Sequence, residues 1–506
     1  MKKKWMQLWA FLLAVSMLTA GCGAKKEEEP VVQEVQTEEA VTEKEEEVQK
    51  EELIPFSVTS KSNNKTYYLE DGETPYLYLE YCDVMVETSE YEDLKRNLEN
   101  WSLERSESLR NQNQTYLEFV KNEANMDNFY AYSLGQRLIN ARVDEAVVSL
   151  IDFSYEYTGG VHGLHYRGGV NFDTKTGKKL SLEDVIIDME NFRTDAVEHI
   201  IYELQENYAE GLFPGFEATV NAIWDNEQEP AWYFDANGLV MVLQEYAVGP
   251  YAMGAPEIHF TYADYQQYIK DAYLPGDFEG IARLTKNEEC FLTFSGAVEV
   301  PVMLKCEWQE YLTEASLWVG NTEISIGEIS SLDDAYIVKY QGNVYCMVEV
   351  DMASADYVTY VYQLTEKDAK VVAQIGASID AANINVNEVV MESWVYLLGT
   401  YGGIKTYRFD ENGNFATGDT EYLLHKNTYV LTTTADLPVE IAGEDSMLPK
   451  GSHIVLNATD NESYVTFTIE ETGQTGVMKI QRGDDYFVKI HGMDEMDCFE
   501  ELPYAG

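Results

Sequence analysis

Two histidines beside a glycine-rich turn carry the first sign of chemistry in this chain. His162 and His165 are three residues apart, and the run Thr158-Gly159-Gly160-Val161-His162-Gly163 contains the first of them. Such a pair would serve as part of a metal site or as a general base. A zinc site needs three or four ligands, and no cysteine or third histidine lies nearby in sequence. The pattern therefore favours the alternative that His162 hydrogen-bonds the backbone of a loop whose glycines adopt positive φ.

A second segment with recognition chemistry runs from Glu245 to Gly254. Tyrosines interrupt its run of small residues, and Tyr251 follows Pro250 directly. Exposed tyrosine is typical of interface anchors, because the ring contributes a large contact area. The competing interpretation is that Tyr251 packs across the end of a sheet as a structural corner. The candidate binding residues from the two segments are Gly159, Gly160, His162, Gly163, Tyr246, Pro250, Tyr251 and Gly254.

No sequence motif for catalysis or cofactor binding accompanies these residues. The chain contains neither a Gly-x-Ser-x-Gly nucleophile elbow nor a phosphate-binding loop with Gly-Lys-Thr. The runs 410–414 and 235–238 resemble calcium loops only faintly, because neither has the twelve-residue ligand pattern, and hairpin turns explain them better. We therefore expect no catalytic residue, no metal ligand and no cofactor.

The first 22 residues indicate export and attachment to lipid. Lys2, Lys3 and Lys4 precede the apolar run Trp5–Leu18. That run is shorter than the roughly 20 residues needed to span a bilayer, so it predicts a signal peptide. The run Leu18-Thr19-Ala20-Gly21-Cys22 closely resembles a lipoprotein signal, which implies cleavage before Cys22 and acylation of its thiol. The alternative is an ordinary secretory signal with an incidental cysteine. We expect a lipid anchor on the outer face of a bacterial cytoplasmic membrane.

The chain is strongly acidic, with a formal net charge of −54. Removal of residues 1–21, which hold three lysines and no acidic residue, makes this −57. Such a chain is repelled by nucleic acid, so we expect no nucleic-acid partner, and its electrostatic partners are cations and basic proteins. The simpler interpretation is that acidity keeps the protein soluble. Residues 25–52 hold twelve Glu and four Lys without an aromatic residue, which predicts a disordered tether extending into the cell wall.

Cysteine usage does not indicate a disulfide framework. Five cysteines follow Cys22, an odd number, so at least one stays unpaired within the chain. Cys290 and Cys306 flank a predicted hairpin and would be the pair to meet. We expect most of the five to be small buried hydrophobic residues.

Hydrophobic periodicity predicts an α+β module of antiparallel strands with two amphipathic helices up to about residue 275. The first helix follows Leu94, Leu98 and Trp101, and the second follows Phe192 to Leu204. Predicted strands cover residues 76–86, 129–139, 141–157, 168–172, 232–234, 239–243 and 258–262. Ser181 and Asp184 approximate a capping box.

Beyond residue 281 the sequence turns to short strands separated by turns, which predicts an all-β region, either a sandwich or blade-like. The final strands suggest a small five-stranded SH3-like barrel. The predicted division is 1–21 (signal peptide), 22–55 (lipidated cysteine and tether), 56–150 and 151–275 (α+β module), 281–427 (β-rich domain) and 428–506 (barrel-like domain).

Four motifs in order give residues 57–268 a resemblance to a known module. They are Tyr155-Glu156-Tyr157-Thr158-Gly159-Gly160-Val161-His162-Gly163, Asn171-Phe172-Asp173 with 176–180, Phe234 with Gly238-Leu239, and the run 245–254. This part resembles the extracytoplasmic module of RsiV-type anti-sigma factors, which are lysozyme receptors, and the N-terminal part of PdaC-type peptidoglycan deacetylases. Two positions depart from the pattern: Val161 stands where Ala is usual, and Val248-Gly249 replaces a more common Ala.

The resemblance implies an α+β fold and a role in the cell envelope, but it implies no enzyme activity. In the deacetylases the chemistry belongs to a separate domain with an Asp-Asp and His-xxx-His metal site, and neither motif occurs here. The anti-sigma factors signal through a cytoplasmic domain and a transmembrane helix, and we expect no transmission by that route.

These inferences lead to three function hypotheses. The first is a non-catalytic surface lipoprotein that binds lysozyme, another basic protein or peptidoglycan. The second is a cell-wall-modifying enzyme with an unrecognised site, which predicts a cleft with several carboxylates of perturbed pKa. The third is a structural or assembly lipoprotein. An exposed aromatic patch around Tyr251 would favour the first hypothesis.

Overall fold

The computed structural model describes residues 56–504 except 73, 125–128, 225–228, 277–278, 295–297, 310–311, 426–428 and 484–486. The predicted signal peptide, Cys22 and the tether lie outside the described residues. The described part is a mixed α+β structure in which strands dominate, as the sequence predicts. None of its helices is both long enough and apolar enough to cross a membrane.

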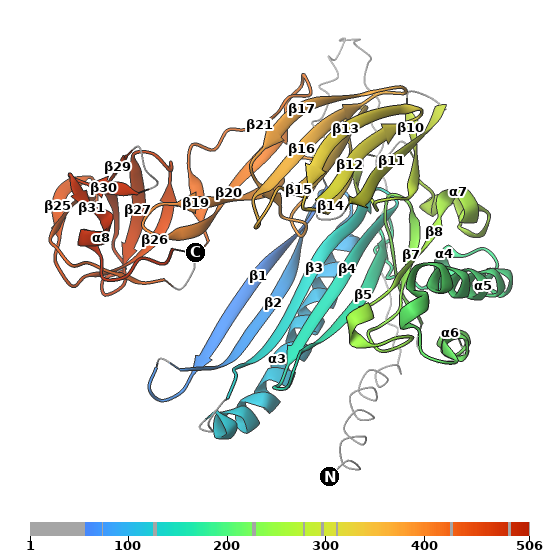
Figure 1. Ribbon diagram of the computed structural model, residues 1–506, viewed down its shortest axis with the longest axis horizontal. Coiled ribbons are helices and arrows are strands. Elements are labelled where there is room, and N and C mark those ends of the chain that lie inside the picture. Colours follow the sequence, from blue (N-terminus) through green and yellow to red (C-terminus); the bar gives the residue numbers. More distant parts are fainter. Residues whose placement is uncertain are drawn as a thin grey trace, which may run out of the picture. The chain divides into compact units, whose positions relative to one another are not determined.

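A ten-stranded sheet joins the N-terminal half of the chain to the β-rich region (Figure 1). Its main path is β1 (Ser57–Tyr68), β2 (Pro75–Glu87), β3 (Tyr132–Asp144), β9 (Gly280–Arg283), β14 (Ser331–Tyr340), β15 (Asn343–Asp351), β16 (Tyr357–Leu364) and β17 (Ala369–Ile375). Strands β4 (Val147–Tyr157) and β5 (Leu164–Asp173) branch from the free side of β3. Because β9 pairs with both β3 and β14, hydrogen bonding is continuous across the predicted division near residue 280.

One long helix explains an exception to the antiparallel pattern. Helix α3 (Glu92–Glu123) returns the chain between β2 and β3, so these two strands pair in parallel. Leu94 and Leu98 are buried, as the helical spacing predicts, and Leu109 further along the helix is buried as well, whereas Phe119 is exposed. Arg105 on α3 donates from Nε to Asp152 Oδ2 of β4 at 2.8 Å, which holds the helix against one face of β1–β5.

The turn between β3 and β4 lies later than predicted. The sequence prediction ended the first strand at residue 139, but β3 continues to Asp144. The carboxylate of Asp144 accepts the backbone N–H groups of Ala146 and Val147 at 2.8 and 2.9 Å. This local side-chain capping makes the turn at 145–146.

A second α+β unit follows β5. Its three-stranded sheet comprises β6 (Ala231–Phe234), β7 (Gly238–Val242) and β8 (Glu257–Thr261). Helix α5 (Met189–Tyr208) covers it with Phe192, Ala196, Ile200 and Leu204, all buried as predicted. The capping box of Ser181 and Asp184 is present at α4 (Leu182–Val185). The remaining helical segments are α6 (Phe216–Ile223), α7 (Tyr262–Tyr265), η1 (Ala209–Gly211), η2 (Tyr251–Met253), η3 (Gln266–Tyr268) and η4 (Asp271–Tyr273).

Residues 289–364 form a sandwich, one of the two forms predicted for residues 281–427. A four-stranded sheet of β10 (Glu289–Phe294), β11 (Val298–Gln309), β12 (Leu312–Val319) and β13 (Thr322–Ile329) packs on β14–β16. Leu304 and Leu317 from one sheet share a buried cluster with Cys346 and Val348 from the other. Burial of both inner faces is the arrangement expected of packed sheets.

The prediction of an SH3-like barrel in residues 428–506 is wrong. Strand β22 (Tyr422–Leu424), from before this range, pairs with β26 (His453–Thr459) and extends the sheet. Among the described strands, the order is therefore an open path, β18-β19-β20-β22-β26-β27-β28-β24-β25. The further bounds are β18 (Ser378–Ile379), β19 (Val389–Tyr396), β20 (Thr400–Phe409), β21 (Phe415–Thr417), β23 (Leu431–Thr432), β24 (Leu437–Ile441), β25 (Glu444–Leu448), β27 (Tyr464–Ile469) and β28 (Thr475–Lys479). A separate sheet holds β29 (Gln481–Arg482), β30 (Val488–Ile490) and β31 (Met493–Asp494), and α8 (Glu495–Cys498) follows.

The five described cysteines form no disulfide. Cys82, Cys290, Cys346 and Cys498 are buried and Cys306 is partly buried, so the expectation of small buried residues is confirmed. Cys290 lies opposite Val302 in the β10–β11 pair, so the suggested partner Cys306 is out of register with it.

Candidate functional site

The glycine-rich turn between β4 and β5 presents His162 at the edge of the sheet. Gly159 and Gly160 adopt φ of 86° and 114°, which a residue with a side chain would rarely do. The imidazole Nδ1 of His162 donates to the carbonyl oxygen of Gly163 at 2.9 Å. His162 thus makes a backbone hydrogen bond of the kind that the structural interpretation predicts.

Residues of the 245–254 segment lie against this histidine. The rings of His162 and Tyr251 stack with centroids 3.8 Å apart and an interplanar angle of 14°. The hydroxyl of Tyr246 donates to His162 Nε2 at 3.1 Å, which together with the bond to Gly163 suits one neutral tautomer. Tyr246 has φ of 64°, an unusual value for a bulky residue.

Two side chains attach the same loop to the edge strand β5. The carboxylate of Glu245 accepts the backbone N–H of His165 at 3.1 Å and its ring Nδ1–H at 3.0 Å. The amide of Gln244 accepts the backbone N–H of Arg167 at 3.2 Å and donates to its carbonyl oxygen at 2.6 Å. Together they occupy backbone groups that an edge strand otherwise leaves unpaired. The loop therefore has a defined position relative to the sheet.

An open hollow of about 510 Å³ lies beside this cluster, on the face of the sheet opposite α3. We call it the aromatic hollow. One wall consists of Phe153, Tyr155, His162, His165 and Tyr251. The ring of His165 lies 4.9 Å from that of Tyr155 and 5.5 Å from that of Phe153, between centroids.

Glycines provide the space in the hollow. Gly135 of β3 is paired with Tyr155, and its missing side chain leaves a trough beside that ring. Gly163 also lines the hollow, and a Cβ at this position would overlap the ring of Tyr155. Partial burial, followed by the Glu245 carboxylate, raises the pKa of Tyr251 above its ordinary value.

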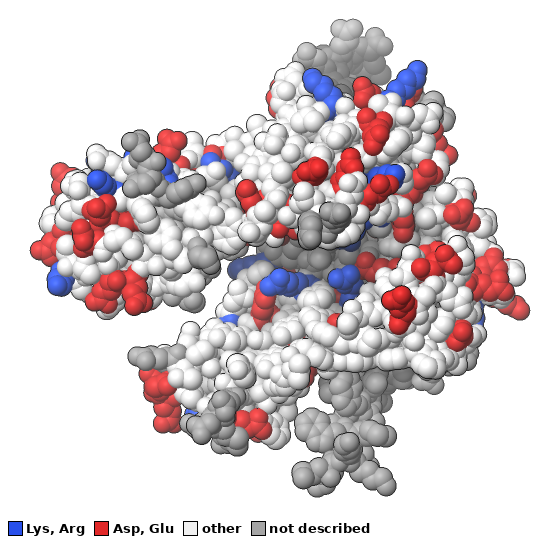
Figure 2. All heavy atoms as spheres, viewed as in Figure 1, with Lys and Arg blue, Asp and Glu red and all other residues white. Residues whose placement is uncertain are grey.

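The opposite wall is an ion pair between β3 and β2. Arg137 donates from Nε to Oε1 and from Nη2 to Oε2 of Glu80, both at 3.2 Å. The Arg137 side chain is 69% exposed. Figure 2 shows Asp and Glu side chains over much of the margin of this face, whereas several Lys and Arg side chains gather around a hollow near its centre, over the region of β3 and β4.

The structure brings together some of the residues that the sequence nominated. His162, Gly163 and Tyr251 line the hollow, and Tyr246 contacts it through His162. Gly159 and Gly160 shape the turn, while Pro250 and Gly254 flank the 3₁₀ turn η2 that carries Tyr251. Sequence reasoning missed Glu80, Gly135 and Arg137, because strand pairing alone brings β2 and β3 beside β4.

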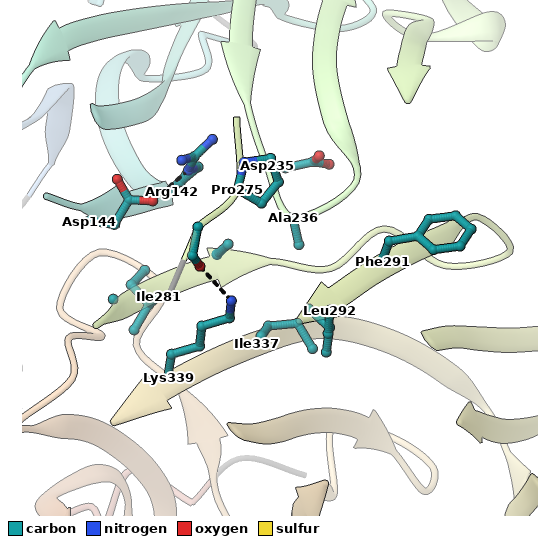
Figure 3. A pocket seen from close by; sticks show the side chains of 13 residues that line it. Arg142, Asp144, Asp235, Ala236, Pro275, Ile281, Phe291, Leu292, Ile337 and Lys339 are labelled. Carbon is teal, nitrogen blue, oxygen red and sulfur yellow. Dashed lines mark hydrogen bonds and ion pairs between the residues drawn. The ribbon is translucent and has the colours of Figure 1, made fainter. Parts of the chain in front are cut away.

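A second cavity, at the junction of β3, β9 and β14, encloses only about 50 Å³ (Figure 3). Its polar groups bond to one another: Arg142 Nε donates to Asp144 at 2.7 Å, and Lys339 Nζ donates to the carbonyl oxygen of Gly276 at 2.7 Å. A space of this size holds at most a few water molecules. We therefore exclude this cavity as a ligand site.

No group of three or more His, Cys, Asp or Glu side chains in the described part of the chain has a geometry that would hold a metal ion. One compact polar cluster does occur beneath β8. His259 Nδ1 lies 3.3 Å from Glu288 Oε2 and 3.7 Å from Asp235 Oδ2. Burial raises the pKa of Glu288 to about 7.

Comparison with known proteins supports a family assignment for one segment. Residues 183–263 match the family model described as a protein of unknown function, DUF3298. A crystal structure of a DUF3298 family protein from Pseudomonas aeruginosa is 18% identical, with a TM-score of 0.33, over 44% of this chain and 98% of that one. A DUF3298 family member from Bacteroides fragilis is 18% identical, also with a TM-score of 0.33, over 43% and 94%. No curated protein matches the chain.

Proposed function

We propose that this protein is a non-catalytic, surface-tethered binding protein that holds a glycan of the cell wall, peptidoglycan, in the aromatic hollow. The observation that carries the proposal is the stacked pair of His162 and Tyr251 at the rim of an open trough. Two separate segments of chain supply these rings, and side-chain hydrogen bonds hold His162 and the loop that carries Tyr251.

The chemistry of the hollow suits a sugar chain. The C–H faces of a pyranose ring are apolar and lie flat on aromatic rings such as Tyr155 and Tyr251, which combine a large apolar area with a polar tip. Hydroxyl and acetamido groups need donors and acceptors at the margin, and Arg137 and Glu80 supply them. The trough above Gly135 is concave, which favours a narrow chain over a flat protein surface.

The carboxylates near the hollow favour binding over hydrolysis. A glycosidase needs two carboxyl groups beside the scissile bond, one of them protonated. Here Glu80 is engaged by Arg137 and Glu245 by His165. Both carboxylates therefore hold the walls of the hollow in position.

The N-terminal sequence supports a location at the cell wall. Lipid on Cys22 and an acidic tether over residues 25–52 would place the folded part outside the cytoplasmic membrane, within reach of peptidoglycan. The resemblance of residues 57–268 to the modules of RsiV-type and PdaC-type envelope proteins agrees with this role.

The net charge of −54 favours a second candidate ligand, a basic protein of the lysozyme class. Long-range attraction would accelerate association with a basic partner and would weaken with added salt. This attraction belongs to the whole surface, however, and does not depend on the hollow.

Calorimetry of residues 56–506 tests the proposal, with solubilised peptidoglycan fragments and lysozyme as separate titrants. We expect heat from the glycan fragments that disappears in Tyr251→Ala. Binding of lysozyme alone, unchanged by Tyr251→Ala, would overturn the glycan proposal in favour of the basic-protein candidate. Release of shortened fragments during the titration would instead show an enzyme.

A further inference from the structure

We propose that the aromatic hollow prefers saccharides that carry a carboxylate, and that Arg137 is the residue that selects them. This inference rests on the proposed glycan binding and names the ligand class of the same site. In peptidoglycan the carboxylate would belong to the lactyl ether of muramic acid or to the peptide attached to it.

The geometry of Arg137 leaves donors for a ligand. Its Nε and Nη2 are used by Glu80, but Nη1 makes no hydrogen bond within the described residues. The Arg137 side chain is 69% exposed, whereas the side chain of its partner Glu80 is 33% exposed. The carboxylate thus lies closer to the sheet and orients the arginine, and the guanidinium projects toward solvent. An arginine fixed in this way is suited to a planar carboxylate.

Arg137 stands beside the aromatic wall. It is paired with Phe153 across β3 and β4, and the neighbouring pair is Gly135 with Tyr155. Arg137 and Tyr155 line the same hollow, so a substituent on a sugar ring that lies against Tyr155 would extend toward the guanidinium. The lactyl group of muramic acid is such a substituent.

The charge of the lining supports an acidic ligand. Acidic residues outnumber Lys and Arg by 89 to 35 in the whole chain. The hollow, in contrast, is lined by one carboxylate, Glu80, and one guanidinium, that of Arg137. An acidic ligand would therefore meet less repulsion in the hollow than the net charge of the chain implies.

Three soluble probes test the preference: chitobiose, which is neutral; the peptide-free disaccharide of N-acetylglucosamine and N-acetylmuramic acid; and the same disaccharide with its peptide. We expect the wild-type protein to bind the peptide-free acidic disaccharide about tenfold more tightly than chitobiose, the gain of one charge-assisted hydrogen bond. The peptide-bearing probe, in which the lactyl carboxyl is an amide, distinguishes the two sources of carboxylate.

Arg137→Gln should abolish the preference, so that the acidic disaccharide and chitobiose bind with equal affinity, and Arg137→Lys should retain part of it. The matched control is Arg96→Gln, since Arg96 is an exposed arginine paired with Asp93 on α3. Equal wild-type affinities for the acidic and neutral disaccharides, with both lost in Tyr251→Ala, would overturn the inference and leave glycan binding intact. If no saccharide binds, the proposed function fails, and the inference fails with it.

Discussion

The rings of His162 and Tyr251 stack 3.8 Å apart, although one belongs to the turn after β4 and the other to the loop before β8. Tyr246 fixes the second nitrogen of the same imidazole by its hydroxyl. The stack therefore joins two loops into one surface, and this surface forms the rim of the aromatic hollow.

Removal of the Tyr251 ring should weaken ligand binding without unfolding the protein. Tyr251 lies on a partly exposed 3₁₀ turn, so Tyr251→Ala removes a stacking face but leaves the cores intact. We expect a loss of about 1–2 kcal/mol in binding free energy, roughly tenfold in affinity, by calorimetry. Tyr202→Ala, on the exposed side of α5, is the matched control and should bind as the wild type does. An equal loss in both variants would contradict the assignment of the site.

A methyl group at Gly163 should close the hollow. The added Cβ would overlap the Tyr155 ring, which can move because its far end faces the trough. We expect Gly163→Ala to lower affinity about tenfold, since a displaced ring forfeits its stacking contact. The melting temperature should change little. Gly376→Ala is a control, because a Cβ at that position meets nothing within 4 Å.

Loss of the Glu245 carboxylate should release the loop from β5. Glu245→Ala leaves two donors of His165 without their acceptor, which costs about 1–3 kcal/mol of unfolding free energy. Hydrogen exchange should accelerate at the backbone amides of His165 and Arg167, and Glu206→Ala on α5 should leave both amides unchanged. Unaltered protection of the two amides in Glu245→Ala would show that the hydrogen bonds of Glu245 are not needed to hold the loop against β5.

Stability should fall as the pH rises through about 7, because of Glu288. Burial raises its pKa from 4.5 to about 7 in the folded protein, so the neutral carboxyl is the favoured form. The contribution of this group to the free energy of unfolding is complete below about pH 4.5. It is lost as the pH rises through about 7, by up to about 3 kcal/mol. His259, 3.3 Å from this carboxyl, reduces the loss when it is charged.

Urea unfolding between pH 5 and pH 8 measures this effect. Glu288→Gln should be less sensitive to pH than the wild type and more stable at pH 8. Glu299 is an exposed glutamate on β11, and Glu299→Gln should show the same dependence of unfolding free energy on pH as the wild type. If the unfolding free energy depended on pH in the same way in all three proteins, Glu288 would not be the titrating group.

Lipid attachment predicts a change of location for one substitution. In a bacterial host, the wild-type chain should incorporate labelled palmitate and remain with the membrane fraction. Cys22→Ser removes the thiol that would carry the lipid, so the label should be lost and the protein released. Palmitate incorporation by Cys22→Ser would contradict the lipoprotein assignment.

Local patterns predicted much of the secondary structure. Leu94 and Leu98 of α3, and Phe192 to Leu204 of α5, occupy the buried stripes that their spacing indicates, because a period near 3.6 is set by the backbone itself. The turns at Gly159-Gly160 and 235–238 also follow from residue types that permit unusual dihedral angles or cap the backbone.

Pairing between strands that are far apart in the sequence could not be predicted from the sequence. The extension of the final sheet by β22, which rules out the predicted barrel, depends on edge hydrogen bonds that any extended segment is able to make. The same limit applies to the candidate site. Residue types and spacing nominated His162, Tyr246 and Tyr251 one segment at a time. Only the packed sheet set Glu80, Gly135 and Arg137 opposite them, because a contact between distant segments is decided by the burial and register of the whole fold.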